Sequence, residues 1–227
     1  MAKKRISDVL IEVLANAGIE RIYGITGDSL NSVNDSLRRN GKITFEHVRH
    51  EETAAFAAGA EASLTHKLTV CAGSSGPGNL HLINGLFDCH RNRVPVLAIA
   101  SHIPQSEVGL NYFQETHPEN LFKECSCFCE LVSNPKQMPE ILFRAMNAAV
   151  GNQDVAVIVL PGDVAVMEME IDELPVWNPP RLPHIVPQRE DIEEMAAHLE
   201  TGKRITLFCG AGCEGAHDEV VELAKRL

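Results

Sequence analysis

Apolar residues follow helical and strand-like periods in turn from residue 6 to about residue 165. Residues 6–17 place apolar side chains at the i, i+3, i+4 and i+7 spacing of a helix, and residues 19–25 have the pattern of a short strand. Regular alternation of strands and helices implies parallel strands joined by right-handed crossovers. We therefore expect an α/β fold with a doubly wound, mostly parallel sheet. The other expected strands are 43–48, 68–72, 94–100 and 155–160, and the other expected helices begin near Asp28 and cover 51–64, 79–91 and 137–150.

Two of these strands are apolar along their whole length. Residues 94–100 and 155–160 offer no polar face, which is typical of central strands in a parallel sheet. In such sheets ligands bind outside the carboxyl ends of the strands. Three segments follow strands in this way, and we expect their loops to lie at one sheet edge: Ile25 to Asp28, the turn before Glu51, and Cys71 to Gly78.

Composition removes several classes of protein. The 227 residues are 44% hydrophobic and 22% charged, which is ordinary for a globular chain. A net charge of −11 argues against a nucleic-acid partner. No apolar stretch approaches the ~18 residues of a membrane span, and no export signal follows Met1, so we expect a cytoplasmic protein. The seven cysteines are expected to be reduced, and the spacing of Cys125, Cys127 and Cys129 does not favour a zinc site.

Prolines mark a boundary in the second half of the chain. Five of them fall between residues 171 and 189, where no helical or strand period is present. We interpret 1–172 as one domain, 173–188 as a linker, and 189–227 as the beginning of a second α/β domain. The last segment is expected to contain a helix at 189–199, a strand at 205–209 and a helix at 218–227. One such unit cannot cover both faces of a sheet, so we expect a piece of a longer protein.

Glu51 is the most informative single residue. A carboxylate at the start of a helix is often only a capping group, because the helix dipole and unpaired N–H groups favour it there. Its expected neighbourhood is what sets it apart, since the glycine turns at Gly27 and at Gly73, Gly76 and Gly78 follow adjacent strands. The histidines of the expected loops could not be sorted by sequence alone.

A second glycine cluster matches the dinucleotide fingerprint G-x-G-x-x-G. Gly210, Gly212 and Gly215 follow the expected strand 205–209 and precede a helix. The acidic residue that should follow about 20 positions later lies past Leu227. Neither a G-x-x-x-x-G-K-[ST] phosphate loop nor a G-x-S-x-G serine elbow occurs in the sequence. These observations favour a ligand-binding α/β domain.

Five ordered strings of residues, each at an expected strand end, helix start or loop, together resemble a known family. They are Gly27-Asp28-Ser29-Leu30-Asn31, Arg49-His50-Glu51-Glu52 with the alanine-rich helix after it, Ser75-Gly76-Pro77-Gly78-Asn79-Leu80-His81, Phe113-Gln114-Glu115-Thr116-His117-Pro118 and Leu160-Pro161-Gly162-Asp163. The chain resembles the thiamine-diphosphate enzymes of the pyruvate oxidase and acetolactate synthase group over nearly its whole length. Within that group it is most similar to the bacterial quinone-reducing pyruvate dehydrogenases.

The resemblance implies a subunit of three domains. The first binds the pyrimidine of the cofactor, the second binds FAD in many members, and the third holds the diphosphate through Mg²⁺. This chain would supply the first domain and the start of the second. The family's Gly-Asp-Gly to Asn-Asn motif, which carries the Mg²⁺ ligands, is absent here, so this piece alone is expected to be inactive.

The resemblance also assigns roles to particular residues. Glu51 would hydrogen-bond the pyrimidine ring nitrogen and favour the imino tautomer, whose basic nitrogen removes the thiazolium proton. Phe113 and Gln114 would face the substrate in a site completed by a neighbouring subunit. The cofactor-binding residues implied by the family motifs are Thr26, Gly27, Pro77 and Asn84 for the pyrimidine, and Gly210, Ala211 and Gly212 for FAD.

The expected activity of the full-length protein is oxidative decarboxylation of pyruvate to acetate and CO₂, with electrons passing through FAD to a quinone. A homodimer or homotetramer is expected, because the family builds each site from two subunits. Three alternatives stay open. The protein could be an acetolactate synthase-type carboligase, a non-catalytic module that binds a cofactor or partner, or, with less support, a simple Rossmann dehydrogenase.

Overall fold

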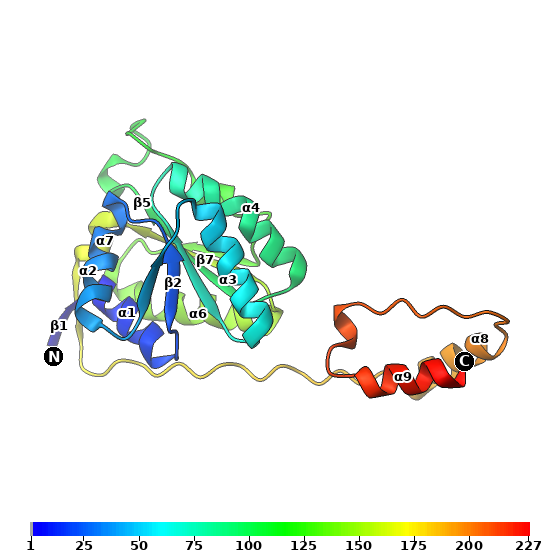
Figure 1. Ribbon diagram of the computed structural model, residues 1–227. Helices are drawn as coiled ribbons and strands as arrows, with labels where there is room; N and C mark the ends of the chain where they lie inside the picture. Colours follow the sequence, from blue (N-terminus) through cyan, green and yellow to red (C-terminus); the bar gives the residue numbers. More distant parts are fainter. Residues whose placement is uncertain (1) are drawn as a thin grey trace. The chain divides into compact units, whose positions relative to one another are not determined.

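The computed structural model describes residues 2–227. Contacts within the chain divide these residues into two units, 2–182 and 183–227. The two units are described separately. The first contains the long parallel sheet and nearly all buried side chains (Figure 1).

The sheet has six strands, and every neighbouring pair is parallel. This confirms the predicted α/β fold class. The two strands that are apolar on both faces, β5 and β7, pair with each other over seven residues near the middle of the sheet. In spatial order the strands are β3 (Thr44–His47), β2 (Arg21–Gly24), β4 (Thr69–Gly73), β5 (Val96–His102), β7 (Val155–Pro161) and β6 (Phe128–Leu131).

Helices cover both faces of the sheet (Figure 1). Side chains alternate along each strand, so that Leu97 and Ile99 of β5 join one apolar core while Ala98 and Ala100 join the other. The first core is closed by α1 (Ile6–Asn16), α2 (Asn31–Asn40), α6 (Met138–Asn152) and the short α7 (Gly162–Val166). The second core is closed by α3 (Glu51–Thr65), α4 (Pro77–Asn92) and the single turn α5 (Pro118–Leu121).

A separate two-stranded sheet joins the beginning of this unit to a later segment. Strand β1 (Ala2–Arg5) pairs antiparallel with β8 (Glu168–Ile171), with Arg5 opposite Glu168 and Lys3 opposite Glu170. Neither strand was predicted. Both strands are only four residues long; β1 is mostly basic, and β8 offers just Met169 and Ile171 on its apolar face. The pairing joins segments far apart in the chain, so no local pattern specifies it.

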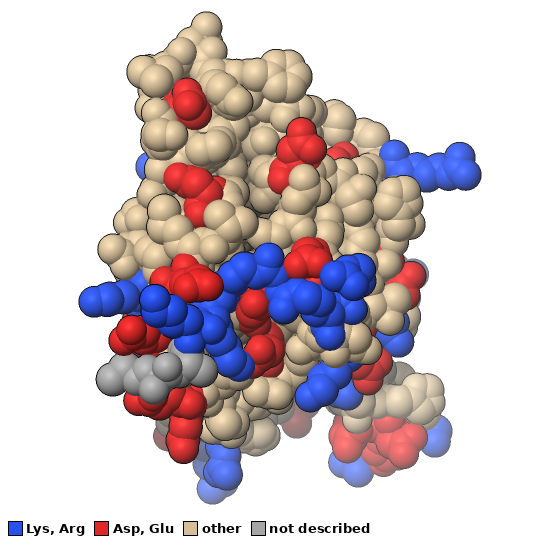
Figure 2. Space-filling view, turned by 90° about the vertical axis from the view of Figure 1, so that its left-hand side faces the viewer, with Lys and Arg blue, Asp and Glu red and all other residues tan. Residues whose placement is uncertain are grey.

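Charged side chains gather over α2 and its surroundings, where positive and negative groups alternate (Figure 2). Asp35 accepts hydrogen bonds from Arg5, Arg38 and Arg39, which lower the pKa of its carboxyl well below the ordinary range. Because the groups are exposed, each pair contributes little to stability. The upper part of the same view, where Figure 1 places the loop of residues 103–117, shows few charged groups.

The second unit, residues 183–227, contains α8 (Arg189–Glu200) and α9 (His217–Arg226), close to the two predicted helices. The predicted strand at 205–209 is wrong: these residues form no strand, and Phe208 is fully exposed. A strand needs a neighbour to accept its backbone hydrogen bonds, and residues 183–227 contain none. Across the part of the chain that the structure describes, no helix combines the length and apolar character needed to cross a membrane.

Candidate active site

Glu51 is the first residue of α3, four residues after the carboxyl end of β3 at His47. His50 before it is extended, and its Nδ1 accepts a hydrogen bond from the Glu52 N–H at 3.3 Å, which caps the helix. The alanine-rich face of α3 lets α4 approach closely. A Cβ at Gly85 of α4 would lie 2.5 Å from Ala55 Cβ and 2.8 Å from the Glu52 carbonyl oxygen. The two helix starts are therefore held side by side.

The carboxylate of Glu51 is buried, with 7% of the residue exposed. Its Oε2 lies 3.1 Å from Nδ1 of His81 on α4, and the His81 ring stacks on His50 with 4.3 Å between centroids. A Cβ at Gly78 would come within 3.2 Å of the other carboxylate oxygen, Oε1. The absence of a side chain at Gly78 thus leaves room for Glu51 at the first turn of α4.

Backbone turns from three loops meet beside this carboxylate. A Cβ at Gly27 would lie 2.5 Å from Ser74 Cβ, so only a glycine permits that approach. The hydroxyl of Ser29 accepts a hydrogen bond from the Ser75 N–H at 2.9 Å. Gly76 has φ +69° and lies against the backbone of Gln114. The expectation that loops after β2, β3 and β4 share one sheet edge agrees with this geometry.

Not all of the residues implied by the family motifs lie near Glu51. Pro77 is the exposed first residue of α4, one position before Gly78. Asn84 donates its hydrogen bond to Glu52 instead of Glu51. Thr26 is exposed and lines a different hollow, together with Ile43 and Phe45. The structure therefore brings Gly27 and Pro77 to the turns around Glu51, while Thr26 and Asn84 face elsewhere.

Phe113 and Gln114 line a cavity of about 320 Å³ at the carboxyl end of β5. Its wall also contains Ser75 of the glycine turn, Ser32 of α2 and His102, the last residue of β5. His102 Nδ1 and Ser32 Oγ are buried and have no hydrogen-bond partner within the described residues. Burial lowers the pKa of His102, which favours the neutral ring.

The cavity adds residues that sequence reasoning did not select. His102 was noted only as one of several loop histidines, and Ser32 was not noted. A sequence signal for His102 did exist, because it directly follows the apolar run of β5 at the ligand-binding edge. His81 carried a similar signal, since it lies one helical turn after Pro77, which begins α4.

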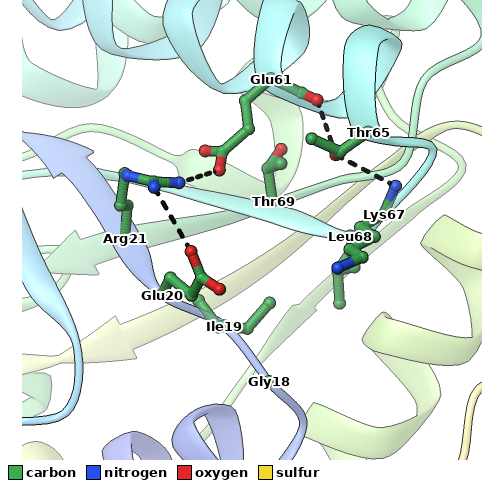
Figure 3. A pocket seen from close by; sticks show the side chains of 9 residues that line it. All are labelled: Gly18, Ile19, Glu20, Arg21, Glu61, Thr65, Lys67, Leu68 and Thr69. Atoms are coloured by element: carbon green, nitrogen blue, oxygen red, sulfur yellow. Dashed lines mark hydrogen bonds and ion pairs between the residues drawn. The ribbon is translucent and has the colours of Figure 1, made fainter.

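A second hollow, of about 180 Å³, lies at the opposite edge of the sheet, around the amino ends of β2 and β4 (Figure 3). Glu61 of α3 forms an ion pair with Arg21, and its backbone oxygen accepts from the Thr65 hydroxyl. Its other carboxylate oxygen accepts the hydroxyl of Tyr23 at 2.9 Å. These contacts fix α3 to β2 far from the glycine turns, so we interpret this hollow as structural.

The Tyr23 hydroxyl provides a test of this anchoring. Burial, together with the hydrogen bond to Glu61, raises the pKa of Tyr23 to about 12. Stability from this group is present below the ordinary tyrosine pKa of ~10 and is lost as pH rises through the folded value. Ultraviolet difference spectroscopy should show one of the two tyrosines ionising near the higher value. Glu61→Gln should lower that pKa toward the ordinary one, and a high-pH step that survives in Tyr23→Phe would contradict the assignment.

The flavin site implied by the resemblance has less structural support, and no metal site was expected in this chain. No group of three His, Cys, Asp or Glu side chains that could hold a metal occurs within residues 2–227. Gly210, Ala211 and Gly212 lie at a short 3-10 turn, and a Cβ at Gly210 or Gly212 would meet open space. In the described unit these residues form no cradle for a flavin.

Comparison with known proteins gives the family. Residues 4–121 match the model for the thiamine pyrophosphate enzyme, N-terminal TPP binding domain. Pyruvate oxidase from Lactiplantibacillus plantarum is 32% identical over 223 residues, which cover 96% of this chain and 37% of that protein. Acetolactate synthase from Arthrospira platensis is also 32% identical, over 238 residues that cover 99% of this chain and 41% of that protein.

A still more similar relative has no stated activity. The protein from Pseudomonas amyloderamosa described as an uncharacterized 42.6 kDa protein in isoamylase 3'region is 58% identical over 228 residues. The match covers all of this chain and 58% of that protein, so the chain spans between 37% and 58% of the length of these three relatives. The matched residues include Glu51, both glycine turns and the loop up to Leu121. The chain therefore belongs to the thiamine pyrophosphate enzyme family and contains its N-terminal TPP-binding domain.

Proposed function

We propose that the carboxyl of Glu51 binds the aminopyrimidine ring of thiamine diphosphate. The observation that carries the proposal is a buried acid at the first turn of α3, bordered by glycine turns from two neighbouring loops. Gly78 carries no side chain beside Oε1 of Glu51, which suits the close approach of a flat ring. An acid that can donate or accept a proton matches the ring nitrogen of the pyrimidine, so the residues present fit this group.

Each residue around the acid has a distinct part in this proposal. Glu51 holds a proton at the ring nitrogen, and His81, 3.1 Å away, fixes the direction of its carboxylate. The small exposed fraction of Glu51 keeps water from competing for the same hydrogen bond. When bound, the cofactor supplies carbanion stabilisation during decarboxylation of a 2-keto acid.

For the full-length protein we propose oxidative decarboxylation of pyruvate to acetate and CO₂, with FAD and then a quinone receiving the electrons. The relative named pyruvate oxidase supports the substrate and the oxidative outcome. The relative named acetolactate synthase has the same 32% identity, which supports carboligation as a second candidate. Gly210 to Gly212 form no flavin cradle in the described unit, so the FAD in this proposal is supported by the family resemblance alone.

The proposal also includes self-association of the subunit and a bound Mg²⁺ ion. A homodimer or homotetramer would cover the exposed loop that carries Phe113, 78% exposed, and Leu110, 68% exposed. Mg²⁺ would be held by a domain outside this chain. We also place the protein in the cytoplasm. If the protein binds thiamine diphosphate but converts no 2-keto acid, it is a non-catalytic binding module.

The test is a thiamine-diphosphate titration of the full-length protein, followed by product analysis with pyruvate. Saturable binding and formation of acetate are expected. Formation of acetolactate would replace the oxidase proposal by the carboligase. Failure to bind thiamine diphosphate in the presence of Mg²⁺ would overturn the assignment of Glu51, and an absorption spectrum without a flavin band would remove FAD from the proposal.

A further inference from the structure

The loop that carries Phe113 and Gln114 has an unusual backbone. Between β5 and α5, Asn111 has φ +57° and Gln114 has φ +64°, and Gly109 has φ +84°. Left-handed conformations outside glycine are uncommon and persist only where the surroundings hold them. Some contact must therefore keep residues 109–114 in this shape.

The carboxylate of Glu115 supplies that contact. One of its oxygens accepts a hydrogen bond from the Gly109 N–H, and the other accepts from the Tyr112 N–H at 3.0 Å. The Glu115 N–H in turn donates to the Tyr112 carbonyl at 3.0 Å. The bonds from Gly109 and Tyr112 lower the pKa of the Glu115 carboxyl, so it is ionised at neutral pH and accepts strongly. Glu115 thus closes residues 109–115 into one turn.

This turn rests on the glycine turn beside Glu51. A Cβ at Gly76 would lie 2.7 Å from Gln114 Cβ and 2.9 Å from the Gln114 carbonyl oxygen. Gly76 can lie this close to the Gln114 backbone only because it has no side chain. Tyr112, Phe113 and Gln114 then form part of the wall of the 320 Å³ cavity that also contains His102. The shape of this wall depends on how residues 109–114 are folded.

We propose that Glu115 is a positioning residue, which acts through Gln114 by folding the loop onto Gly76 and so shaping the wall of the cavity that Phe113 and His102 line. The proposal rests on the function proposed above, because it assigns Phe113 and Gln114 to the substrate side of the same site. Glu115 itself does not line the cavity, so its effect on turnover is indirect. Small displacements of positioning groups are known to reduce rates strongly.

The first experiment measures loop order without using activity. Hydrogen exchange of peptides that cover residues 104–117 is compared between the full-length wild type and Glu115→Gln. The amide oxygen of Gln can keep only one of the two backbone bonds, so the N–H of either Gly109 or Tyr112 loses its acceptor and its exchange should accelerate about tenfold. Glu107→Gln is the matched control, because Glu107 lies on the same loop and its carboxylate accepts no hydrogen bond from the N–H of Gly109 or Tyr112. Unchanged exchange in Glu115→Gln would overturn the proposal.

The second experiment is a double-mutant cycle in the full-length enzyme. Glu115→Gln and Gln114→Ala should each lower kcat/KM by roughly 10-fold or more, and the double variant should lose little beyond the larger single loss. If the fold-loss of kcat/KM in the double variant equalled the product of the two single losses, Glu115 would not act through Gln114 and the proposal would be overturned. If the wild type has no 2-keto acid turnover, the proposed function fails separately, and the exchange result alone decides whether Glu115 orders the loop.

Discussion

Glu51→Gln in the full-length protein is expected to lower 2-keto acid turnover by about 10²- to 10⁴-fold, the usual contribution of one positioned acid or base. The amide has nearly the same shape as the acid but cannot hold and release a proton at the pyrimidine nitrogen. The measurement is kcat at saturating thiamine diphosphate and Mg²⁺. An unchanged kcat would contradict the role of Glu51.

Glu52→Gln is the matched comparison, one residue along the same helix. The Glu52 carboxylate is partly exposed and accepts a hydrogen bond from Asn84, so its loss should cost less than about fivefold, the worth of one such bond. Urea unfolding should give similar midpoints for both variants. Equal losses of activity in the two variants would mean that the first turn of α3 acts through its charge and not through Glu51.

Gly85→Ala is expected to destabilise the chain by about 1–3 kcal/mol, as overpacking of a tight interface usually does. The new methyl group would lie 2.5 Å from Ala55 Cβ, 2.8 Å from the Glu52 oxygen and 3.0 Å from the Phe56 nitrogen. Two of these neighbours are backbone atoms, which cannot move aside without shifting α3. Urea unfolding measures the change, and the affinity of the full-length protein for thiamine diphosphate should fall with it because Glu51 begins α3.

Gly151→Ala provides the control for an added methyl group in a helix. Gly151 lies in α6 and is exposed, and outside that helix the nearest atom to an added Cβ would be Pro180 Cγ at 4.0 Å. At this position alanine should raise the free energy of unfolding by up to about 0.5–1 kcal/mol, because it lowers the conformational entropy of the unfolded chain. If Gly85→Ala were as stable as Gly151→Ala, the close contact between α3 and α4 would not exist in solution.

The parallel sheet could be predicted because its signals are local. The runs that became β5 and β7 are apolar on both faces, which only a central strand requires. The start of β5 was predicted at Val94 but lies at Val96. Pro95 explains the difference, since proline has no N–H to donate to a neighbouring strand.

The parts that could not be predicted depend on partners distant in the sequence. The strand expected at 205–209 had the right composition, but no neighbouring strand is present in residues 183–227. The contact of Glu51 with His81 joins the starts of two helices 30 residues apart, and no local pattern specifies it. Thr26 and Asn84 show the opposite case, in which a matching motif position faces away from the acid.

The pairing of Ala2 with Ile171 has a mechanical consequence. Tension applied between the amino terminus and residues 183–188 would first pull on Trp177, which is buried and donates a hydrogen bond to Asn147 of α6. Once Trp177 had been released, the load would reach β8 and β1. Two strands pulled apart from one end lose their hydrogen bonds one at a time. The six-stranded sheet would carry no load until β1 and β8 had separated.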